Sequence, residues 1–408
     1  MKLIKLAGRN VLRHRRRTLI TAAAISIGLA AMIASNTMMN GMDRIVSENI
    51  INYETGHLEV FARGYYREEG MFPLDTIIGH PDSLVKVIEQ IPGISGVTQR
   101  VKFPARVSNG IDEFPVLGIG IDPQTESRVF KTKTALVAGN NIDQPDQALI
   151  GVDLAKTMGV GVDSVLTLII RDRNGTYNAY DLTISGLINT DHPLIDGNAV
   201  LMDIDIAKEL LALGTGATEI SVRIKSESQP EEIRKKIESA AGPANETYAY
   251  KEVYASIFEV TGFKRAIQFM VALVVVIIAA VGIVNTMLMA VMERIPEIGT
   301  LKALGFGSRI ITRIFLYEGG IIGLAGSLIG VITGLLLSLY VVFVGLDFSP
   351  YFNSSDIGYP IKFLIKGEID PGMVLIIFLF GIIVSVLVTL WPVRYATRLQ
   401  PIDALRHV

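Results

Sequence analysis

Residues 319–345 read GGIIGLAGSLIGVITGLLLSLYVVFVG, and the stretch contains no Asp, Glu, Lys or Arg. A helix needs about 20 mainly apolar residues to cross the hydrocarbon core of a bilayer, and this run is long enough to do so. Further uncharged runs of comparable length occupy residues 18–42, 266–292 and 371–393. The sequence therefore predicts an α-helical membrane protein with four transmembrane helices, one before and three after a long hydrophilic insertion.

The composition fits a chain that lies partly in lipid and partly in water. Of the 408 residues, 50% are hydrophobic and only 19% are charged, and the mean hydropathy is +0.43. Residues 43–262 nevertheless have the mixed composition of a domain with its own core. Strand-like alternation at residues 165–170 and 182–188 interleaves with helix-like stretches such as residues 229–241. We therefore predict one large extracytoplasmic α+β domain between the first and second helices.

Basic residues near the ends of the uncharged runs predict the orientation. Between residues 43 and 262, 20 Lys or Arg stand against 32 Asp or Glu, a balance of −12 that suits the outer face. Lys264 and Arg265 oppose this orientation, but more basic residues follow the second run than precede it. With four spans, both termini lie in the cytoplasm. The basic residues that precede the first run, with no acid among them, are Lys2, Lys5, Arg9, Arg13, Arg15, Arg16 and Arg17.

The runs and the basic clusters together set the expected boundaries. The first run follows a basic segment as a signal peptide would, but its length and the lack of a small-x-small cleavage site favour an uncleaved helix. The basic segment fits either a helix on the membrane surface or a plain positive anchor. The expected parts are a cytoplasmic amphipathic segment (1–17), helix one (18–42), the outer α+β domain (43–262), helix two (263–292), a cytoplasmic loop (293–309), helix three (310–345), an outer loop (346–370), helix four (371–393) and a cytoplasmic C-terminus (394–408).

Small side chains recur every fourth residue in two of the predicted spans. Residues at this spacing share one helix face, and small ones let two helices approach closely. We interpret the two stripes as packing seams, within the bundle or at a subunit interface. They consist of Ala22, Ser26, Ala30 and Ala34 in the first span, and of Gly326, Gly330, Gly334 and Ser338 in the third.

The sequence offers no catalytic constellation. There is no Cys, no Gly is followed by Lys as a phosphate-binding G-x-x-x-x-G-K-[ST] loop requires, and the five His make no metal-ligand pair. We expect a non-catalytic subunit without metal or cofactor.

Two polar residues in the spans stand out. We expect Asn285 to bond a neighbouring helix, and Glu318 to pair with Arg309 or Arg313 rather than to move protons or ions.

The loop at residues 293–307 reads ERIPEIGTLKALGFG. Pro296 suits a first helical position and Gly305 a helix stop, so the loop predicts a short helix. Its apolar stripe either docks a cytosolic partner or lies on the membrane, and physical reasoning leaves both open. The stripe consists of Ile298, Leu301 and Leu304.

This loop resembles the E-R-x-x-E-I-G-x-L-(K/R)-A-L-G signature of MacB/FtsX/LolE-type ABC transporter permeases. Residues 6–18, LAGRNVLRHRRRT, are similar to the family's opening motif. Residues 391–406, WPVRYATRLQPIDALR, are similar to its closing motif, with Val393 in place of an Ala. The motifs lie at both ends and in the middle, so the resemblance covers essentially the whole chain.

The resemblance implies a multi-pass permease of the bacterial inner membrane that works by mechanotransmission. A separate cytoplasmic ABC ATPase would bind ATP and Mg²⁺, and a second permease subunit, identical or different, would complete the transporter. Closure of the ATPases would move the loop and pass the stroke to the outer domain, without nucleic acid. The ATPase-coupling residues implied in this way are Glu293, Arg294, Glu297, Ile298, Gly299, Leu301, Lys302, Ala303, Leu304 and Gly305.

The branch of the family decides the cargo. An outer domain of about 220 residues fits lipoprotein-releasing permeases of the LolC/LolE type. The form of the loop is nearer to MacB-like export permeases, which would act with a periplasmic adaptor, and Pro296 replaces a residue that is usually polar. An FtsX-like regulator of cell-wall hydrolases, with a shorter outer domain, is a third alternative, and a membrane receptor or scaffold without an ATPase is a fourth.

Overall fold

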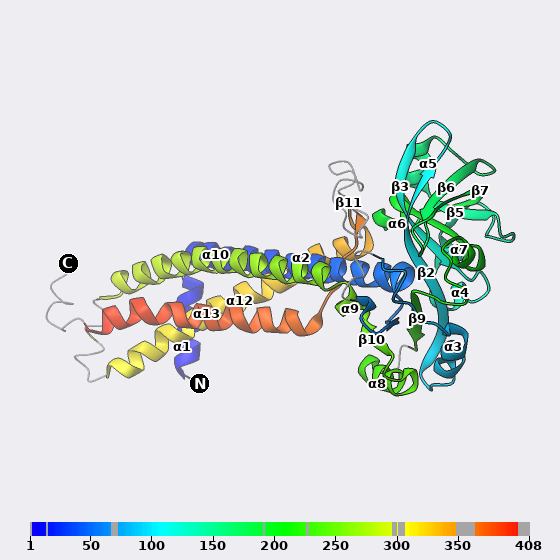
Figure 1. Ribbon diagram of the computed structural model, residues 1–408. Helices are drawn as coiled ribbons and strands as arrows, with labels where there is room; N and C mark the ends of the chain where they lie inside the picture. Colours follow the sequence, from blue (N-terminus) through cyan, green and yellow to red (C-terminus); the bar gives the residue numbers. More distant parts are fainter. Residues whose placement is uncertain are drawn as a thin grey trace. The chain divides into compact units, whose positions relative to one another are not determined.

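The structure is a computed structural model that describes residues 2–13, 15–66, 72–190, 192–225, 228–295, 300, 307–347 and 364–398 (Figure 1). The chain divides into two compact units. The helical unit comprises Met1–Asp43, Thr261–Leu346 and Leu364–Val408, and the α+β unit comprises Arg44–Val260 and Asp347–Phe363.

The helical unit consists of long rods that lie side by side (Figure 1). Among the described residues, three helical segments are long and apolar enough to cross a membrane, namely Thr18–Glu54, Ser308–Phe343 and Pro371–Arg394. The second predicted span lies within α10, of which Ala280–Glu293 is a shorter apolar stretch, so the count of four spans stays a prediction. The elements are α1 (Lys2–Arg13), α2 (Arg15–Asn49), α10 (Ala255–Glu293), α12 (Ser308–Phe343), α13 (Pro371–Arg398) and the strand pair β11 (Leu346–Asp347) and β12 (Leu364–Ile365).

Two stripes of small residues bring α2 and α12 close together. A Cβ placed on Gly326 would lie 2.9 Å from the Ile25 Cβ and 3.0 Å from the Ala22 oxygen. The same close approach repeats along the helices, since Gly330 lies against Ser26 and Gly334 against Ala30. Ala34 is only half-buried. In the following turn a hydrogen bond of 2.9 Å between the Thr37 and Ser338 hydroxyls continues the contact.

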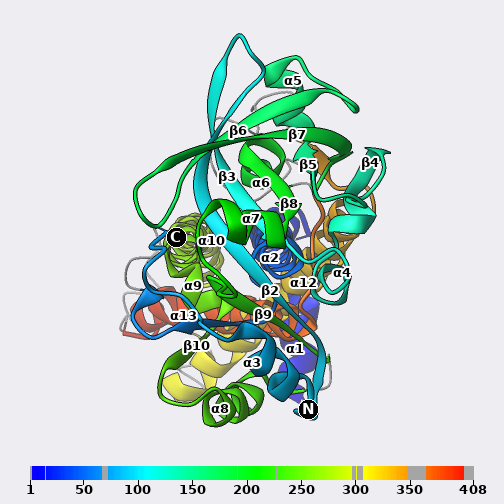
Figure 2. The same cartoon turned by 45° about the vertical axis from the view of Figure 1, so that its right-hand side comes forward.

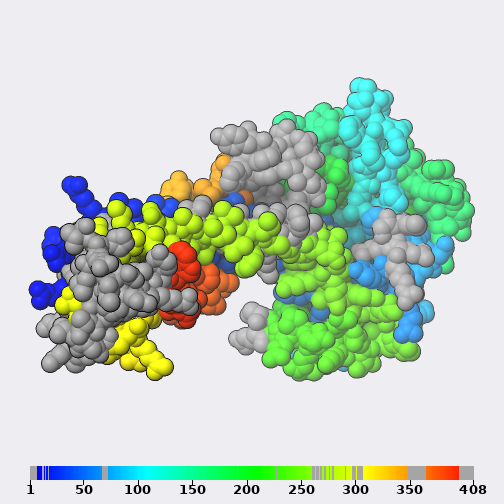
Figure 3. All heavy atoms as spheres, turned by 90° about the vertical axis from the view of Figure 1, so that its left-hand side faces the viewer, coloured from blue at the N-terminus to red at the C-terminus, as the bar shows by residue number. Residues whose placement is uncertain are grey.

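Helix α10 is visible on the surface of the helical unit in Figure 3 as the yellow-green band. Large side chains on this helix are more than half exposed, as expected for a face that meets lipid or another helix. They include Phe269, Met270, Ile277, Val281 and Met289.

The α+β unit is built on one mixed ten-stranded sheet with the order β10-β1-β9-β2-β3-β8-β5-β7-β4, in which β6 pairs with β2 and β7. The pairs β3–β8 and β5–β7 are parallel and the others antiparallel. The strands are β1 (Leu58–Ala62), β2 (Ile94–Ser108), β3 (Glu113–Ile121), β4 (Leu136–Gly139), β5 (Gln147–Gly151), β6 (Val165–Arg171), β7 (Tyr177–Ile188), β8 (Ala199–Asp203), β9 (Glu219–Ile224) and β10 (Asn245–Ala249). The predicted α+β class is therefore confirmed.

Helices begin where the sequence supplies an N-terminal signal. Pro occupies the first turn of α3, α6 and α8, where its missing N–H costs nothing. Asp203 caps α7 by accepting hydrogen bonds from the Asp205 and Ile206 amides. These elements and the short turns are η1 (Ile50–Glu54), α3 (Pro81–Glu89), α4 (Glu126–Val129), η3 (Thr132–Ala135), α5 (Val152–Met158), α6 (Pro193–Asn198), α7 (Ile204–Leu210), α8 (Pro230–Ala241) and α9 (Tyr250–Val253).

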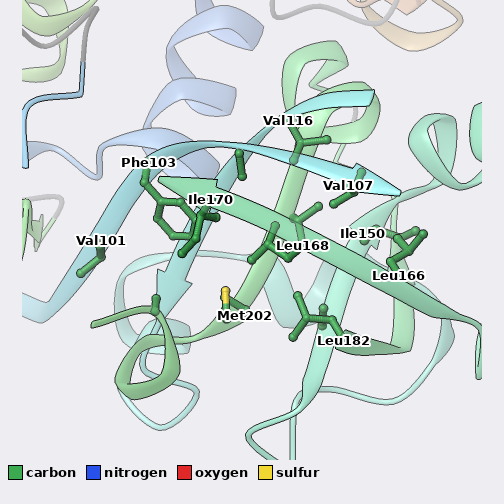
Figure 4. Close-up of a cluster of buried hydrophobic side chains, with 14 of the residues drawn as sticks. Val101, Phe103, Val107, Val116, Ile150, Leu166, Leu168, Ile170, Leu182 and Met202 are labelled. Atoms are coloured by element: carbon green, nitrogen blue, oxygen red, sulfur yellow. The ribbon is translucent and has the colours of Figure 1, made fainter. Parts of the chain in front are cut away.

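Strand β2 is shared by the two lobes of the α+β unit (Figure 2). Its first part pairs with β9 in the smaller lobe, whose core lies under α3 and α8. Its second part pairs with β3 and β6 in the larger lobe, where Phe103 packs among Ile170, Leu168 and Met202 (Figure 4). The register changes partner at Arg100, which lies opposite Glu219 of β9 and Ile121 of β3. A residue at this position therefore touches both lobes.

The seam between α2 and α12 gives the first testable prediction. Gly326→Val adds three carbon atoms where even a Cβ is too close, and overpacking of this kind costs about 1–3 kcal/mol. The midpoint of thermal unfolding of the purified protein in detergent should fall. The matched control is Gly282→Ala in α10, whose added Cβ meets nothing within 4 Å and should leave the midpoint unchanged or slightly raised. Equal midpoints for the two variants would contradict the packing described here.

Candidate coupling site

Two of the ten implied coupling residues belong to the described part of the chain. Glu293 ends α10 and Arg294 follows it. The other eight, Glu297, Ile298, Gly299, Leu301, Lys302, Ala303, Leu304 and Gly305, lie outside the described residues. The docking role of the apolar stripe therefore stays a prediction. Of the ten residues, the structure describes only Glu293 and Arg294, at the start of the loop, which we call the base of the loop.

A buried carboxylate ties three elements together at this base. The Arg294 Nη1 lies 2.9 Å from the Glu318 Oε1 of α12, and the Asn10 Nδ2 of α1 donates to the same oxygen over 2.7 Å. The Arg294 guanidinium also lies 5.1 Å from the centroid of the Phe315 ring. The side chains of Glu318 and Arg294 are only 7% and 17% exposed. Any displacement of Arg294 at the start of the loop thus acts on α12 and α1 together.

The expected partners of Glu318 were wrong. Arg309 and Arg313 are exposed, whereas the carboxylate is buried and bonds Arg294. In α12 these two arginines lie five and nine positions before Glu318, while Arg294 reaches it from the end of a different helix. Helix α12 continues through Gly319 without a break. The general expectation of a structural ion pair holds, but tertiary packing selects the partner.

Polar side chains within the apolar helices pair with one another. The Thr21 hydroxyl donates to that of Thr286 over 2.9 Å, joining α2 to α10. The Ser385 hydroxyl donates to the Gly319 oxygen over 2.8 Å, joining α13 to α12. Asn285, which we expected to bond a neighbouring helix, is exposed within this chain, and its neighbour Thr286 makes that contact instead. Such pairs satisfy groups that lipid could not.

A small apolar cleft lies between α2, α10 and α13. Its lining includes Ile25, Leu29, Ile283, Phe380 and Gly381 and is almost entirely carbon. Gly381 of α13 has no side chain, and this leaves room for the Leu29 side chain of α2. The lining of this cleft therefore presents apolar surface.

Sequence reasoning missed a second cluster, the buried ionic groups of the α+β unit. Arg100 and Lys102 are 1% and 4% exposed and alternate with the apolar Val101 and Phe103 along β2. The available signal was that alternation, in which two cations occupy one face of a strand. On its own it reads as a solvent-facing side, and only the fold shows that this face is covered.

The comparisons with known proteins agree with this architecture. Residues 18–240, more than half of the chain, match the MacB-like periplasmic core domain, and residues 269–401 match the FtsX-like permease C-terminal region. The second region includes the loop at residues 293–307, and permeases of ABC transporters are among the relatives of this chain. The chain belongs to the MacB/FtsX/LolE family of these permeases.

The relatives that cover nearly the whole of this chain include lipoprotein-releasing and macrolide-export proteins. The chain is 25% identical over 401 residues to the lipoprotein-releasing system transmembrane protein LolC of Neisseria meningitidis, covering 96% of this chain and 94% of that protein. It is 25% identical over 407 residues to the corresponding LolE of Haemophilus influenzae, covering 94% and 93%. It is 22% identical over 419 residues to the macrolide export ATP-binding/permease protein MacB of Agrobacterium fabrum, covering 98% of this chain and 60% of that protein.

The Arg294–Glu318 pair gives the second prediction. Removing one partner strands the other charge in a buried site, whereas removing both does not. In a double-mutant cycle of Arg294→Met and Glu318→Leu, the double variant should therefore unfold at a higher temperature than the sum of the two single losses predicts. The coupling should be about 1–3 kcal/mol. Additive effects, measured by thermal unfolding in detergent, would show that the pair does not hold the base of the loop.

Proposed function

We propose that this chain is the permease subunit of a transporter that releases lipid-anchored proteins from the bacterial inner membrane. The observation that carries the proposal is the similarity to LolC and LolE over nearly the full length of both partners, including the outer domain. A cytoplasmic ABC ATPase supplies the energy, and a second permease subunit completes the assembly. The proposal assigns ATP hydrolysis to that ATPase and no reaction to this chain.

The helical unit supports this cargo class. Among its described residues, several polar side chains inside the apolar helices bond a neighbouring hydroxyl or backbone oxygen. The cleft beside Ile25 and Phe380 is apolar. A bundle of this kind is poorly suited to conduct a polar solute but can contact acyl chains from the side.

The energetics explain why such a reaction needs ATP. Withdrawing an acyl chain from the bilayer costs about 0.8 kcal/mol for each CH₂ group that reaches water. A lipoprotein with long chains therefore does not leave spontaneously at a useful rate. In the proposed mechanism the ATPase moves the loop at residues 293–307, and the helices pass the displacement to the α+β unit, which receives the cargo.

Export by a MacB-like mechanism is the second candidate. It is favoured by the match of residues 18–240 to the MacB-like periplasmic core domain and by the similarity to a macrolide export protein. The two candidates share the ATPase and the mechanical stroke and differ in cargo, so a cargo experiment separates them.

Depletion of the protein in its own cells tests the function. Lipoproteins bound for other membranes should remain in the inner membrane, as measured by membrane fractionation, before any change in drug sensitivity. A cargo whose acylated Cys is replaced by Ser provides the control, because it has no anchor to be released. Normal lipoprotein sorting together with accumulation of a peptide or macrolide would establish the export candidate instead.

The docking of the ATPase gives a further prediction. If the stripe of Ile298, Leu301 and Leu304 fills an apolar groove, Leu301→Asp buries an unpaired charge, which costs several kcal/mol of association. The variant should insert into the membrane but lose its ATPase on affinity purification. The matched control is Thr300→Asp, which adds the same charge beside the stripe and should keep the ATPase. Co-purification of the Leu301→Asp variant at the wild-type level would exclude this loop as the docking element.

A further inference from the structure

The end of helix α2 is held by cations of the sheet. Helix α2 runs unbroken from Arg15 to Asn49 and continues as the π-helical turn η1. The last carbonyls of a helix have no partner within it and carry its negative dipole end. Here the Arg100 Nη1 donates to the Tyr53 oxygen over 2.9 Å and to the Glu54 oxygen over 3.2 Å. The Lys102 Nζ donates to the same Glu54 oxygen over 3.2 Å.

A third cation approaches from the neighbouring strand. The Arg223 Nη2 on β9 donates to the Asn52 Oδ1 over 2.9 Å and to the Ile51 oxygen over 3.4 Å. Its Nε donates to the Val129 oxygen. Strands β2 and β9 are adjacent in the sheet, so the helix end is bound from two strands at once.

Buried carboxylates fix these cations in place. The guanidinium of Arg100 binds both oxygens of Glu126 and stacks 3.2 Å from the centroid of the Phe130 ring. The Lys102 Nζ lies 3.1 Å from the Glu219 Oε1 and 3.8 Å from the Glu59 Oε1. All four ionic groups that surround the two cations are at most 4% exposed: Glu54, Glu59, Glu126 and Glu219.

The protonation states support an ionic cluster. Burial lowers the pKa of Lys102, but the carboxylates of Glu219, Glu59 and Glu54 outweigh it and raise the pKa above its usual value, so the ammonium stays charged. His192, whose Nε2 lies 3.7 Å from the Glu54 Oε1, has a pKa lowered by burial despite the attraction of Glu54. The imidazole is therefore neutral at neutral pH, and the cluster is held by Lys and Arg.

Buried ion pairs contribute little net stability compared with apolar residues of the same size, but they impose one geometry. An apolar contact does not fix the position of a helix along the sheet. Here the carbonyls at the helix end accept hydrogen bonds from a lysine and two arginines, so the helix end cannot shift without breaking directional bonds. These hydrogen bonds also lie at the point where β2 changes its partner strand, since Arg100 lies opposite residues of both lobes. The arrangement therefore suits the transfer of a displacement from α2 to the sheet better than it suits stabilisation of the fold.

We propose that Arg100, Lys102 and Arg223, with Glu54, Glu59, Glu126 and Glu219, form an ionic joint that transfers movement of α2 to both lobes of the α+β unit. The proposal rests on the proposed function, since it assumes an ATP-driven stroke. Arg100 and Lys102 are then positioning residues: they touch no cargo, and they make the helix and the sheet move as one body.

Distance measurement between spin labels tests the joint directly. The chain has no Cys, so labels can be placed at Glu48→Cys on α2 and Arg106→Cys on β2, whose side chains are 60% and 56% exposed. The complex with its ATPase is measured without nucleotide and trapped with ATP. The joint predicts one narrow distance distribution that is the same in both states. A distance that changes on trapping overturns the proposal.

A charge-balanced variant separates transmission from stability. Lys102→Gln combined with Glu219→Gln removes one cation and one carboxylate, so the net charge of the cluster does not change. We expect it to fold, to broaden the distance distribution, and to hydrolyse ATP at the wild-type rate while cargo release falls at least tenfold. Lys133→Met, which removes an exposed cation, is the control and should change none of these readouts.

The outcomes distinguish the joint from the function on which it rests. Parallel loss of ATP hydrolysis and release, in proportion to folded protein, indicates a purely structural cluster and overturns the proposal. The proposal is also overturned if the charge-balanced variant keeps the wild-type distance distribution and the wild-type rate of cargo release. The distance readout needs the ATPase but no cargo, so it decides on the joint even if the cargo is not a lipoprotein. Loss of the proposed function would instead show as absent release by the unmodified chain.

Discussion

The hydrocarbon core of a bilayer excludes unpaired backbone groups and charges, and the helical unit follows from this constraint. Long uncharged runs become helices because a helix satisfies its own backbone. The few polar side chains on them, such as Thr21 and Ser385, bond a neighbouring helix or its backbone. Without a hydrophobic force between helices in lipid, association depends on close contact, which the small residues of α2 and α12 permit. The carboxylate of Glu318 in α12 is likewise paired, since it binds Arg294 and Asn10.

Helix α2 connects these features. It contributes residues 15–43 to the helical unit and continues from Arg44 into the α+β unit, with no break before Asn49. Its apolar part packs along α12 through Ala22, Ser26 and Ala30, and its end is gripped by cations of β2 and β9.

The sequence pattern predicted the features that depend on neighbouring residues, namely the helices, the strands and the α+β class. The apolar runs lie in helices, and the strand expected at residues 165–170 and the helix expected at residues 229–241 correspond to β6 and α8. The choice of partners was not predictable, because it depends on contacts between distant segments. Glu318 binds an arginine of another helix rather than one of its own, and Arg100 and Lys102 on β2 face a helix end instead of water. Nothing in the alternation of β2 indicates what covers it, so the ionic cluster emerged only from the fold.

Release of an acylated protein from reconstituted vesicles tests the central claim most directly. Permease and ATPase are placed in proteoliposomes with a fluorescent triacylated protein and a soluble acceptor, and the released fraction is followed by flotation. The account predicts release that requires ATP hydrolysis and the acyl chains, and that is lost with the Lys102→Gln/Glu219→Gln variant while hydrolysis continues. ATP hydrolysis without release by the unmodified complex, together with ATP-driven movement of a macrolide or peptide, would contradict it.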